Sequence, residues 1–385
     1  MENNFNQIID RRQSDSVKWN RASSEVLPMW VADMDFLSPK AVIEQLQARA
    51  AHGVFGYPNH ADGLIEAIQH HLQMHFQWTV SPEEIVFMPG VVPALNLACR
   101  AYAKPGDGIM FHTPVYGPFF HVAESGGFEQ QDILLTRHDN GYYDINIQEF
   151  AAAIKPNTRM YILCNPHNPV GRVYTRKELE QIADTCLKND VLICSDEIHA
   201  DLVFSGHHHI PIASLDKEIA DHSITLMAPS KTFNIAGLDC SFAVISNPEL
   251  RKQYKQAQAG LFGHINLFGQ LAAEAAYRDG QTWLKELLVY LEGNRDYMLN
   301  FMQTELPEIP MTVPEGTYLA WLDCRNTSFA EDPAEYLLKE AKVQVNDGLF
   351  FGPAGKGYVR LNFGCPRSTL EEGLARIKRS IKSFG

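Results

Sequence analysis

One stretch decides the fold: residues 228–234, APSKTFN, which continue the apolar run ITLMA at 224–228. A second apolar run, DVLIC at 190–194, leads in the same way into SDEIH at 195–199. Short apolar runs bounded by polar residues are typical of strands that are buried on both faces of a parallel sheet. We therefore expect Lys231 and Asp196 to lie at the ends of two strands of one sheet.

A lysine and a carboxylate at one edge of a sheet can hold an aromatic aldehyde cofactor from two sides. The lysine forms a Schiff base with the aldehyde, and the carboxylate keeps a ring nitrogen protonated, which is the layout of a pyridoxal phosphate (PLP) enzyme. Each feature alone has a simpler interpretation, because Ser-Lys-Thr is usually a solvated turn and Asp-Glu is often a helix cap. Two further motifs favour the catalytic interpretation: NPHNPVG at 165–171 and MPGVVP at 88–93, each after an apolar strand.

These four motifs, in this order, make the sequence resemble the fold-type I PLP enzymes of the class I/II aminotransferase superfamily over nearly all of its 385 residues. The resemblance implies an α/β fold, in which a mostly parallel sheet flanked by helices is joined to a smaller α+β domain. It also implies a large PLP-binding domain at 46–282 and a discontinuous small domain made of 1–45 and 283–385. Helical and strand patterns alternate between about Ser81 and Ser246, as βαβ units require.

Periodicity predicts the positions of the main elements. Strands are expected near 85–88, 109–112, 132–135, 160–164, 191–195, 224–227 and 241–245, and helices near 39–51, 62–77, 93–103, 176–189 and 267–279. A long amphipathic helix is expected from about Thr282 to Leu306, leading out of the large domain.

Composition excludes several classes of function. The net charge is −13 without a basic stretch, which argues against nucleic-acid binding. No apolar run approaches the ~20 residues that span a bilayer, and the N-terminus lacks a signal pattern. Seven cysteines without a CxxC pair indicate reduced thiols and a cytoplasmic protein. The triple histidine at 207–209 is expected in a surface loop and not as a metal site, because adjacent imidazoles point in different directions.

The phosphate of PLP is best held by main-chain N–H groups at a helix N-terminus. Val91 and Val92, after Gly90, offer such amides, although an ordinary strand-to-helix turn would look the same. Ser230 is a plausible second donor. Most members of the superfamily have an arginine eight residues after the lysine, whereas this chain has Asp239, so neutralisation of the phosphate by a single arginine is in doubt.

The resemblance assigns further residues to the cofactor. It implies that Tyr57, in GVFGYP at 53–58, crosses a homodimer interface to the phosphate of the neighbouring subunit. Tyr116 matches the aromatic residue that stacks on the pyridine ring, with a core tyrosine as the alternative. Asn168 matches the asparagine that contacts the phenolic oxygen of the ring and later the substrate. His199 stands where many aminotransferases have a tyrosine at the same oxygen.

Arg360, in GYVRLNFG at 357–364, resembles the arginine that grips the α-carboxylate of an amino-acid substrate. A guanidinium binds a carboxylate with two parallel hydrogen bonds, which lysine cannot do. The apolar strand pattern around this residue supports a functional charge, because an unpaired buried charge is expensive.

A finer resemblance, to the MalY/PatB-type cystathionine β-lyases, depends on PMWVADMDF at 28–36, NFGCPRS at 362–368 and DEIH at 196–199. Such enzymes cleave the Cβ–S bond of cystathionine or another cysteine conjugate and give a thiol, pyruvate and ammonia. Lys231 would remove the Cα proton, which requires a lowered pKa, and Asp33 would shape the substrate entrance. An aminotransferase shares these early steps and remains an alternative, as does a secondary role in binding a regulatory protein.

Overall fold

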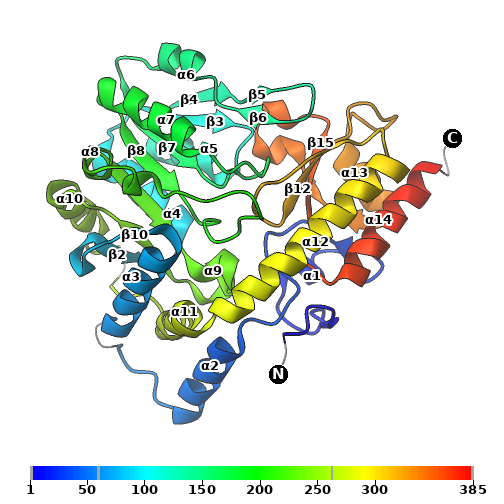
Figure 1. The fold of residues 1–385 in the computed structure, drawn as a ribbon, viewed down its shortest axis with the longest axis horizontal. Helices are drawn as coiled ribbons and strands as arrows, with labels where there is room; N and C mark the ends of the chain where they lie inside the picture. The colour runs from blue at the N-terminus through cyan, green and yellow to red at the C-terminus, as the bar shows by residue number, and fades with distance from the viewer. Residues whose placement is uncertain (1–2, 59–60, 262, 383–385) are drawn as a thin grey trace.

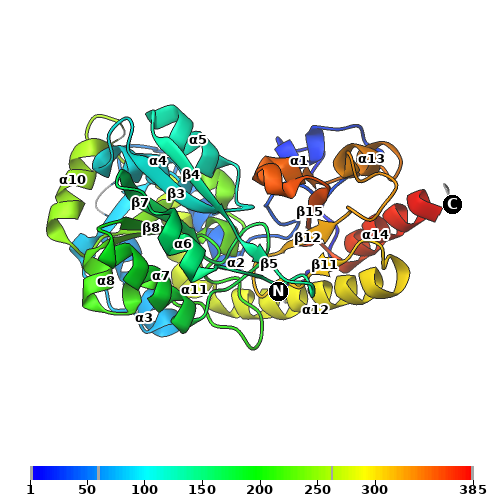
Figure 2. The same ribbon diagram turned by 90° about the horizontal axis from the view of Figure 1, so that it is seen from above.

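The computed structural model describes residues 3–58, 61–261 and 263–382, and the main chain forms a larger and a smaller part (Figures 1 and 2). The larger part is built on a seven-stranded sheet in the order β2-β10-β9-β8-β7-β3-β4. Its strands are β2 (Ile85–Met88), β3 (Gly108–Thr113), β4 (Glu129–Leu134), β7 (Thr158–Cys164), β8 (Leu192–Asp196), β9 (Ser223–Met227) and β10 (Ser241–Val244).

The sheet is mostly parallel, which confirms the predicted α/β fold. Strands β4, β3, β7, β8 and β9 run parallel to one another, whereas β10 is antiparallel to both β9 and β2. Each predicted strand overlaps an observed one, with the largest shift at β4, which begins three residues before the predicted start at 132. Strand β4 is at the edge of the sheet, and most of its side chains are exposed or partly exposed. Its sequence therefore has few apolar residues from which its start could be predicted.

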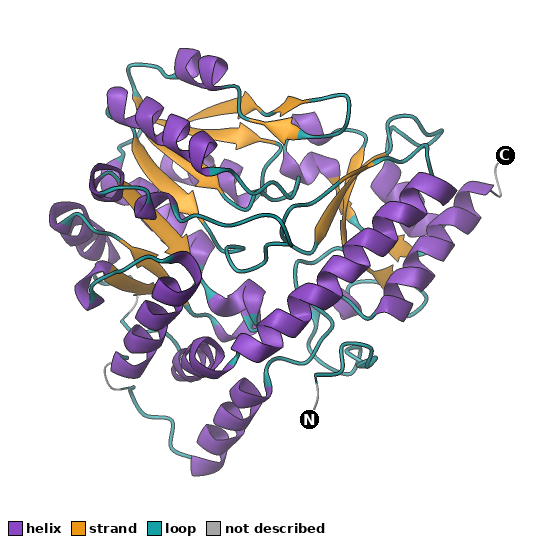
Figure 3. Ribbon diagram, viewed as in Figure 1, coloured by secondary structure: helices purple, strands orange, loops and turns teal. Residues whose placement is uncertain are grey.

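Helices cover both faces of this sheet because successive strand residues point to opposite sides. Phe111 and Ile162 pack with α4 (Val91–Tyr102), α5 (Pro118–Gly126) and α10 (Pro248–Gln258). Met110 and Tyr161 instead pack with α6 (Ile147–Ala153), α7 (Arg176–Lys188) and α8 (Lys217–Asp221). Helices α2 (Lys40–His52), α3 (Asp62–Phe76) and α11 (Leu267–Asp279) pack together beside this layer (Figure 3).

The smaller part contains an antiparallel sheet in the order β11-β12-β15-β14. Its strands are β11 (Met311–Thr312), β12 (Leu319–Asp323), β14 (Asn346–Asp347) and β15 (Tyr358–Asn362), with α13 (Pro333–Lys339) and α14 (Arg367–Lys382) alongside. Near the N-terminus, α1 (Val17–Asn20) precedes β1 (Leu27–Pro28), which pairs in parallel with β13 (Val343–Gln344). This pairing is the kind of contact that a discontinuous small domain needs, and the division at residues 45 and 282 stays a prediction.

Helix α12 (Gln281–Glu305) runs beneath both parts, as Figure 2 shows, and confirms the predicted long helix. Leu284, Leu287 and Leu291 are buried on one of its faces. The side chain of Asn294 donates to the main-chain oxygens of Phe363 (3.1 Å) and Cys365 (2.8 Å), so the helix is fixed to the end of β15. Within the described residues, no helix combines the length and apolar character needed to cross a membrane.

Candidate active site

The site lies where β7, β8 and β9 end at one edge of the sheet. The segments that follow these strands carry Asn168, His199 and Lys231, and Asp196 is the last residue of β8. Strand β15 of the smaller sheet brings Arg360, whose Nη1 donates to Asn168 Oδ1 at 3.1 Å. The parallel order of the three strands explains this convergence, because the carboxyl ends of parallel strands meet at the same edge.

Lys231 lies in the short helix α9 (Pro229–Thr232), and its Nζ donates to the main-chain oxygen of Ala32 at 2.7 Å. Burial and, to a smaller extent, the positive charge of Arg360 together lower the pKa of this amine to about 8. Asp33 and Asp196 oppose this shift. The amine therefore has the lowered pKa that removal of a carbon-bound proton requires.

Asp196 is buried and accepts a 3.2 Å hydrogen bond from the main-chain N–H of Ile198. Burial raises the pKa of its carboxyl to about 7, and the charge of Glu197 adds to the increase. No lysine, arginine or histidine of the described residues forms an ion pair with it. A buried carboxylate in this state is suited to a cationic group that comes from outside the chain.

The carboxylate of Glu197, the next residue, has hydrogen-bonding partners of its own. Its carboxylate accepts from Ser195 Oγ (2.8 Å), the Ile212 main-chain N–H (3.1 Å) and contacts His209 Nε2 (2.7 Å). His209 is buried, so the expectation that all of 207–209 lies on the surface is wrong. Its imidazole leaves the surface because the buried Glu197 carboxylate needs a hydrogen-bond donor.

Arg360 is buried to 3% exposure without a carboxylate partner among the described residues. Its Nη2 donates to the main-chain oxygen of Trp30 (2.8 Å) and to Asn346 Oδ1 (2.6 Å), whereas its Nε has no hydrogen-bond partner. Burial lowers the pKa of the guanidinium to about 10. A buried guanidinium that meets only neutral acceptors has the chemistry of an anion-binding group.

Tyr116 and His199 lie close enough to these charges for their pKa values to respond. Burial raises the pKa of the Tyr116 phenol, an effect that Arg360 opposes and Asp196 reinforces. Burial lowers the pKa of His199 to about 3, with Lys231 and Arg360 acting in the same direction. His199 is therefore neutral, and its buried Nδ1 has no partner, which leaves that nitrogen available to a ligand.

Helix α4 begins at Val91, earlier than the predicted 93, and its N-cap Gly90 makes no side-chain capping bond. The amides of Val91 and Val92 are in the first turn, where main-chain donors lack partners within the helix. Ser230 is half-buried in α9, next to Lys231. Asp239 is exposed, in a left-handed conformation after Leu238, so the acidic residue points to solvent.

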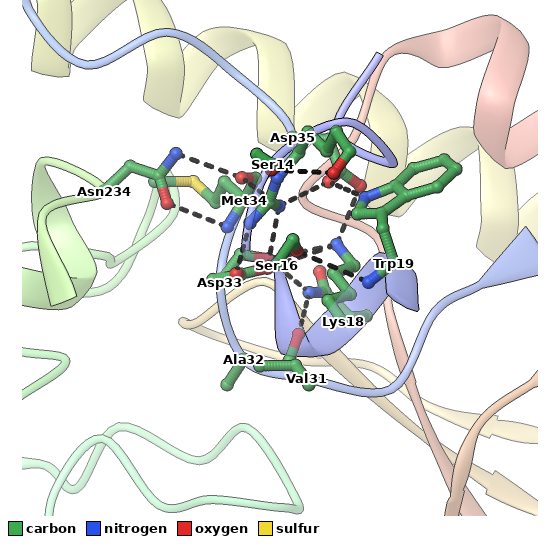
Figure 4. A network of polar contacts seen from close by, with 12 residues as sticks. Ser14, Ser16, Lys18, Trp19, Val31, Ala32, Asp33, Met34, Asp35 and Asn234 are labelled. Carbon is green, nitrogen blue, oxygen red and sulfur yellow. Dashed lines mark hydrogen bonds and ion pairs between the residues drawn. The ribbon is translucent and has the colours of Figure 1, made fainter. Parts of the chain in front are cut away.

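The segment around residues 30–36 covers this site. Asp33 was expected at the substrate entrance from the sequence, but the contacts that hold the segment in place were not anticipated. A cluster of ion pairs holds it, as Figure 4 shows in part: Asp33 contacts Arg11 (2.7 Å) and Lys18 (3.5 Å), and Asp35 contacts the same two cations at 2.7 Å each. Burial by itself would raise the pKa of Asp33, but the Arg11 hydrogen bond and the Lys18 charge lower it below its usual value.

Main-chain oxygens of the same segment face the site. Ala32 accepts from the Tyr318 hydroxyl (2.8 Å) as well as from Lys231. The side chain of Asn234 pairs with the main chain of Met34, accepting from its N–H and donating to its oxygen at 3.0 Å each (Figure 4). Tyr318 and Asn234 are thus site residues that the sequence did not reveal, because an acceptor on the main chain leaves no residue-type signal.

Tyr57 is not brought to this site in the single chain. Its side chain is 96% exposed, in a segment where Val54 and Phe55 are also exposed. Its role toward a neighbouring subunit stays a prediction.

The sheet order, the Lys231–Asp196 pair and the buried arginine together define the class of protein. The sequence model of the family described as "Aminotransferase class I and II" matches residues 24–377, and the chain belongs to this family.

Within it, the chain is 41% identical to cystathionine beta-lyase PatB of Bacillus subtilis, over 98% of this chain and all of that protein. It is 33% identical to protein MalY of Escherichia coli, over 98% of this chain and 99% of the relative. Cystalysin from Treponema denticola, whose crystal structure contains pyridoxal 5'-phosphate, superposes with a TM-score of 0.96 at 34% identity over the full length of both chains.

Proposed function

We propose that the protein is a PLP-dependent carbon–sulfur lyase that cleaves the Cβ–S bond of cystathionine or another cysteine conjugate. The products are a thiol, pyruvate and ammonia. The observation that carries the proposal is the buried Asp196, which has no cationic partner in the described chain, beside a lysine with a lowered pKa. The similarity to a cystathionine beta-lyase over the whole chain supports the choice of substrate.

Unused polar groups in the site fit PLP. Asp196 would face the ring nitrogen, where a protonated pyridine supplies the cation that this carboxylate lacks. The first-turn amides of α4, at Val91 and Val92, would hold the phosphate with Ser230, in the favourable field of the helix N-terminus. Tyr116 would contact the face of the ring, and Asn168 and His199 its phenolic oxygen. When bound, PLP supplies an electron sink for the charge that develops at the substrate Cα.

Lys231 carries the proton in the proposed reaction. A pKa of about 8 leaves about a tenth of the amine unprotonated at pH 7, far more than an ordinary lysine with a pKa near 10.4 would offer. Its Nζ accepts the Cα proton of the substrate, and loss of the thiolate from Cβ follows. The Ala32 oxygen, which accepts from Nζ, orients the amine without adding a charge.

Arg360 would bind the substrate carboxylate. Its unpartnered Nε is one donor, and Nη2 becomes a second if it exchanges the Trp30 oxygen for a carboxylate oxygen. Exchange of a neutral acceptor for an anion is favourable in a buried site, because charge-assisted hydrogen bonds are roughly twice as strong as neutral ones. The hydrogen bond from Nη1 to Asn168 holds the guanidinium in position during this exchange.

Aminotransferase activity is the second candidate, since the family model itself describes aminotransferases. A transaminase transfers its amino group to the cofactor and stops after one half-reaction unless a keto acid is added. A β-lyase releases pyruvate through many turnovers without a keto acid. The decisive test incubates L-cystathionine with the PLP-loaded protein and follows pyruvate and thiol together. Stoichiometric keto-acid formation that stops after one equivalent would overturn the lyase proposal.

We further propose that the active form is a homodimer, in which Tyr57 reaches the phosphate in the neighbouring subunit. The exposure of Tyr57, Val54 and Phe55 supports this, because a cluster of exposed large apolar side chains is typical of an interaction surface.

A further inference from the structure

A cluster of potential metal ligands lies outside the proposed active site. Helix α3 presents His71 and His75 one turn apart, with their rings stacked at 4.4 Å between centroids. Asp201, in the loop after β8, contacts His71 Nε2 through Oδ1 at 2.7 Å. One donor atom from each of the three residues lies within 4.8 Å of the others.

The donor set has the chemistry of a transition-metal site. Two histidines at positions i and i+4 share one face of a helix, and two imidazoles with one carboxylate are a ligand set that Zn²⁺ accepts. A metal ion would take the place of the proton between His71 and Asp201. Gln281 Nε2 lies 3.2 Å from His71 Nδ1. A histidine bound to a metal through Nε2 donates its Nδ1–H, so on metal binding the Gln281 amide would turn to present Oε1, which has no hydrogen-bond partner, to this nitrogen.

The cluster is also reachable. His75 is exposed, so its side chain can turn to bring its nitrogen within the ~2.0–2.1 Å that a Zn–N bond needs. His75 and Asp201 line a cleft of ≈ 560 Å³ that opens to solvent. His207 and His208 line the same cleft, whereas His209 turns away to Glu197, so the three consecutive histidines do not converge on one point.

We propose that His71, His75 and Asp201 form a binding site for a divalent transition-metal ion, with Zn²⁺ as the best-matched ion and an open fourth position in the cleft. The site is separate from the residues proposed to hold PLP but is linked to them. Asp201 Oδ2 accepts a 3.0 Å hydrogen bond from Thr232, the residue after Lys231, so the carboxylate also anchors helix α9.

The test is a competition titration of the PLP-loaded protein with Zn²⁺ and a chromophoric zinc chelator. The variants are His75→Ala, at an exposed position on α3, and the matched control His121→Ala, an exposed helical histidine outside the cluster. We expect one tight site per chain, weakened at least tenfold in His75→Ala and unchanged in His121→Ala. All seven cysteines are buried and unpaired, so they do not compete readily in the folded protein.

A crystal soaked in Zn²⁺ locates the ion by anomalous scattering. A peak bonded to His71, His75 and Asp201 is the expected result. Equal zinc affinity in the wild type and His75→Ala, or an anomalous peak on other residues with none here, would overturn the proposal.

Discussion

Lys231 donates its amine hydrogen bond to the main-chain oxygen of Ala32, 199 residues earlier in the chain, at 2.7 Å. The proposed catalytic lysine is therefore positioned by the segment that covers the site and not by a side chain of its own sheet. Because the acceptor is a neutral carbonyl, it orients the amine without the increase in pKa that a carboxylate at this distance would cause.

Lys231→Ala is expected to abolish turnover and the absorbance of bound cofactor. Borohydride treatment of the wild type should label Lys231, since its buried amine is the nucleophile proposed for the aldehyde. Lys217→Ala, at a side chain with 86% exposure, is the matched control and should behave as the wild type. Full activity in Lys231→Ala, with the label on another lysine, would refute the assignment.

Asp196→Asn is expected to lower kcat roughly a thousandfold, or about 4 kcal/mol of transition-state stabilisation. The amide keeps the shape of the side chain but cannot hold a proton on the ring nitrogen, so the electron sink is lost. Steady-state pyruvate release measures the effect, and Asp196→Glu tests whether a longer carboxylate restores part of it. Near-normal turnover in Asp196→Asn contradicts the proposed role.

Arg360→Lys is expected to lower kcat/KM by roughly a hundredfold, about 3 kcal/mol, through weaker capture of the substrate carboxylate. The point charge of lysine cannot reproduce the fork of the guanidinium, which now also contacts Trp30, Asn346 and Asn168. Retention of the cofactor absorbance separates this effect from a general loss of structure. Loss of that absorbance in Arg360→Lys would instead mean that the arginine is structural.

The Asp33 ion pairs should make stability sensitive to acid. The pKa of Asp33 is lowered in the folded state, so its contribution is complete above the unfolded pKa near 3.9 and is lost as the pH falls through the lower folded value. At pH 7, Asp33→Asn should lower the free energy of unfolding by about 1–3 kcal/mol, because Arg11 and Lys18 lose a partner. Urea unfolding of both proteins from pH 7 to pH 3 checks this. A stability difference that does not shrink at low pH would contradict the assignment.

Mixing two inactive variants tests the shared site. Tyr57→Phe and Lys231→Ala chains should form hybrid dimers after subunit exchange, in which one site has both native residues. Activity should then reappear, given that Tyr57→Phe alone is strongly impaired. Demonstrated exchange without restored activity would show that Tyr57 acts within its own chain.

Most of the large sheet was predictable because its inner strands are continuous apolar runs, and the proposed catalytic residues lie at or just after the ends of two of them. Lys231 and Asp196 could be named from such positions, whereas Arg360, in the middle of β15 of the smaller sheet, was named from the resemblance of the segment GYVRLNFG. Tyr318 and Asn234 could not, because their partners are main-chain oxygens that any residue could supply. The burial of His209 was missed for a related reason. Its imidazole is buried because it contacts the carboxylate of Glu197, which lies 12 residues earlier in the chain.

The carbonyl contacts of the covering segment bear on how this enzyme could change through evolution. Trp30, Val31, Ala32 and Asp33 all present main-chain oxygens to side chains across the site. Substitution at these positions would leave each oxygen in place as long as the path of the chain is kept. The side chains of Val31 and Ala32 could therefore diverge to suit new leaving groups, whereas Asp33 is kept by its ion pairs with Arg11 and Lys18.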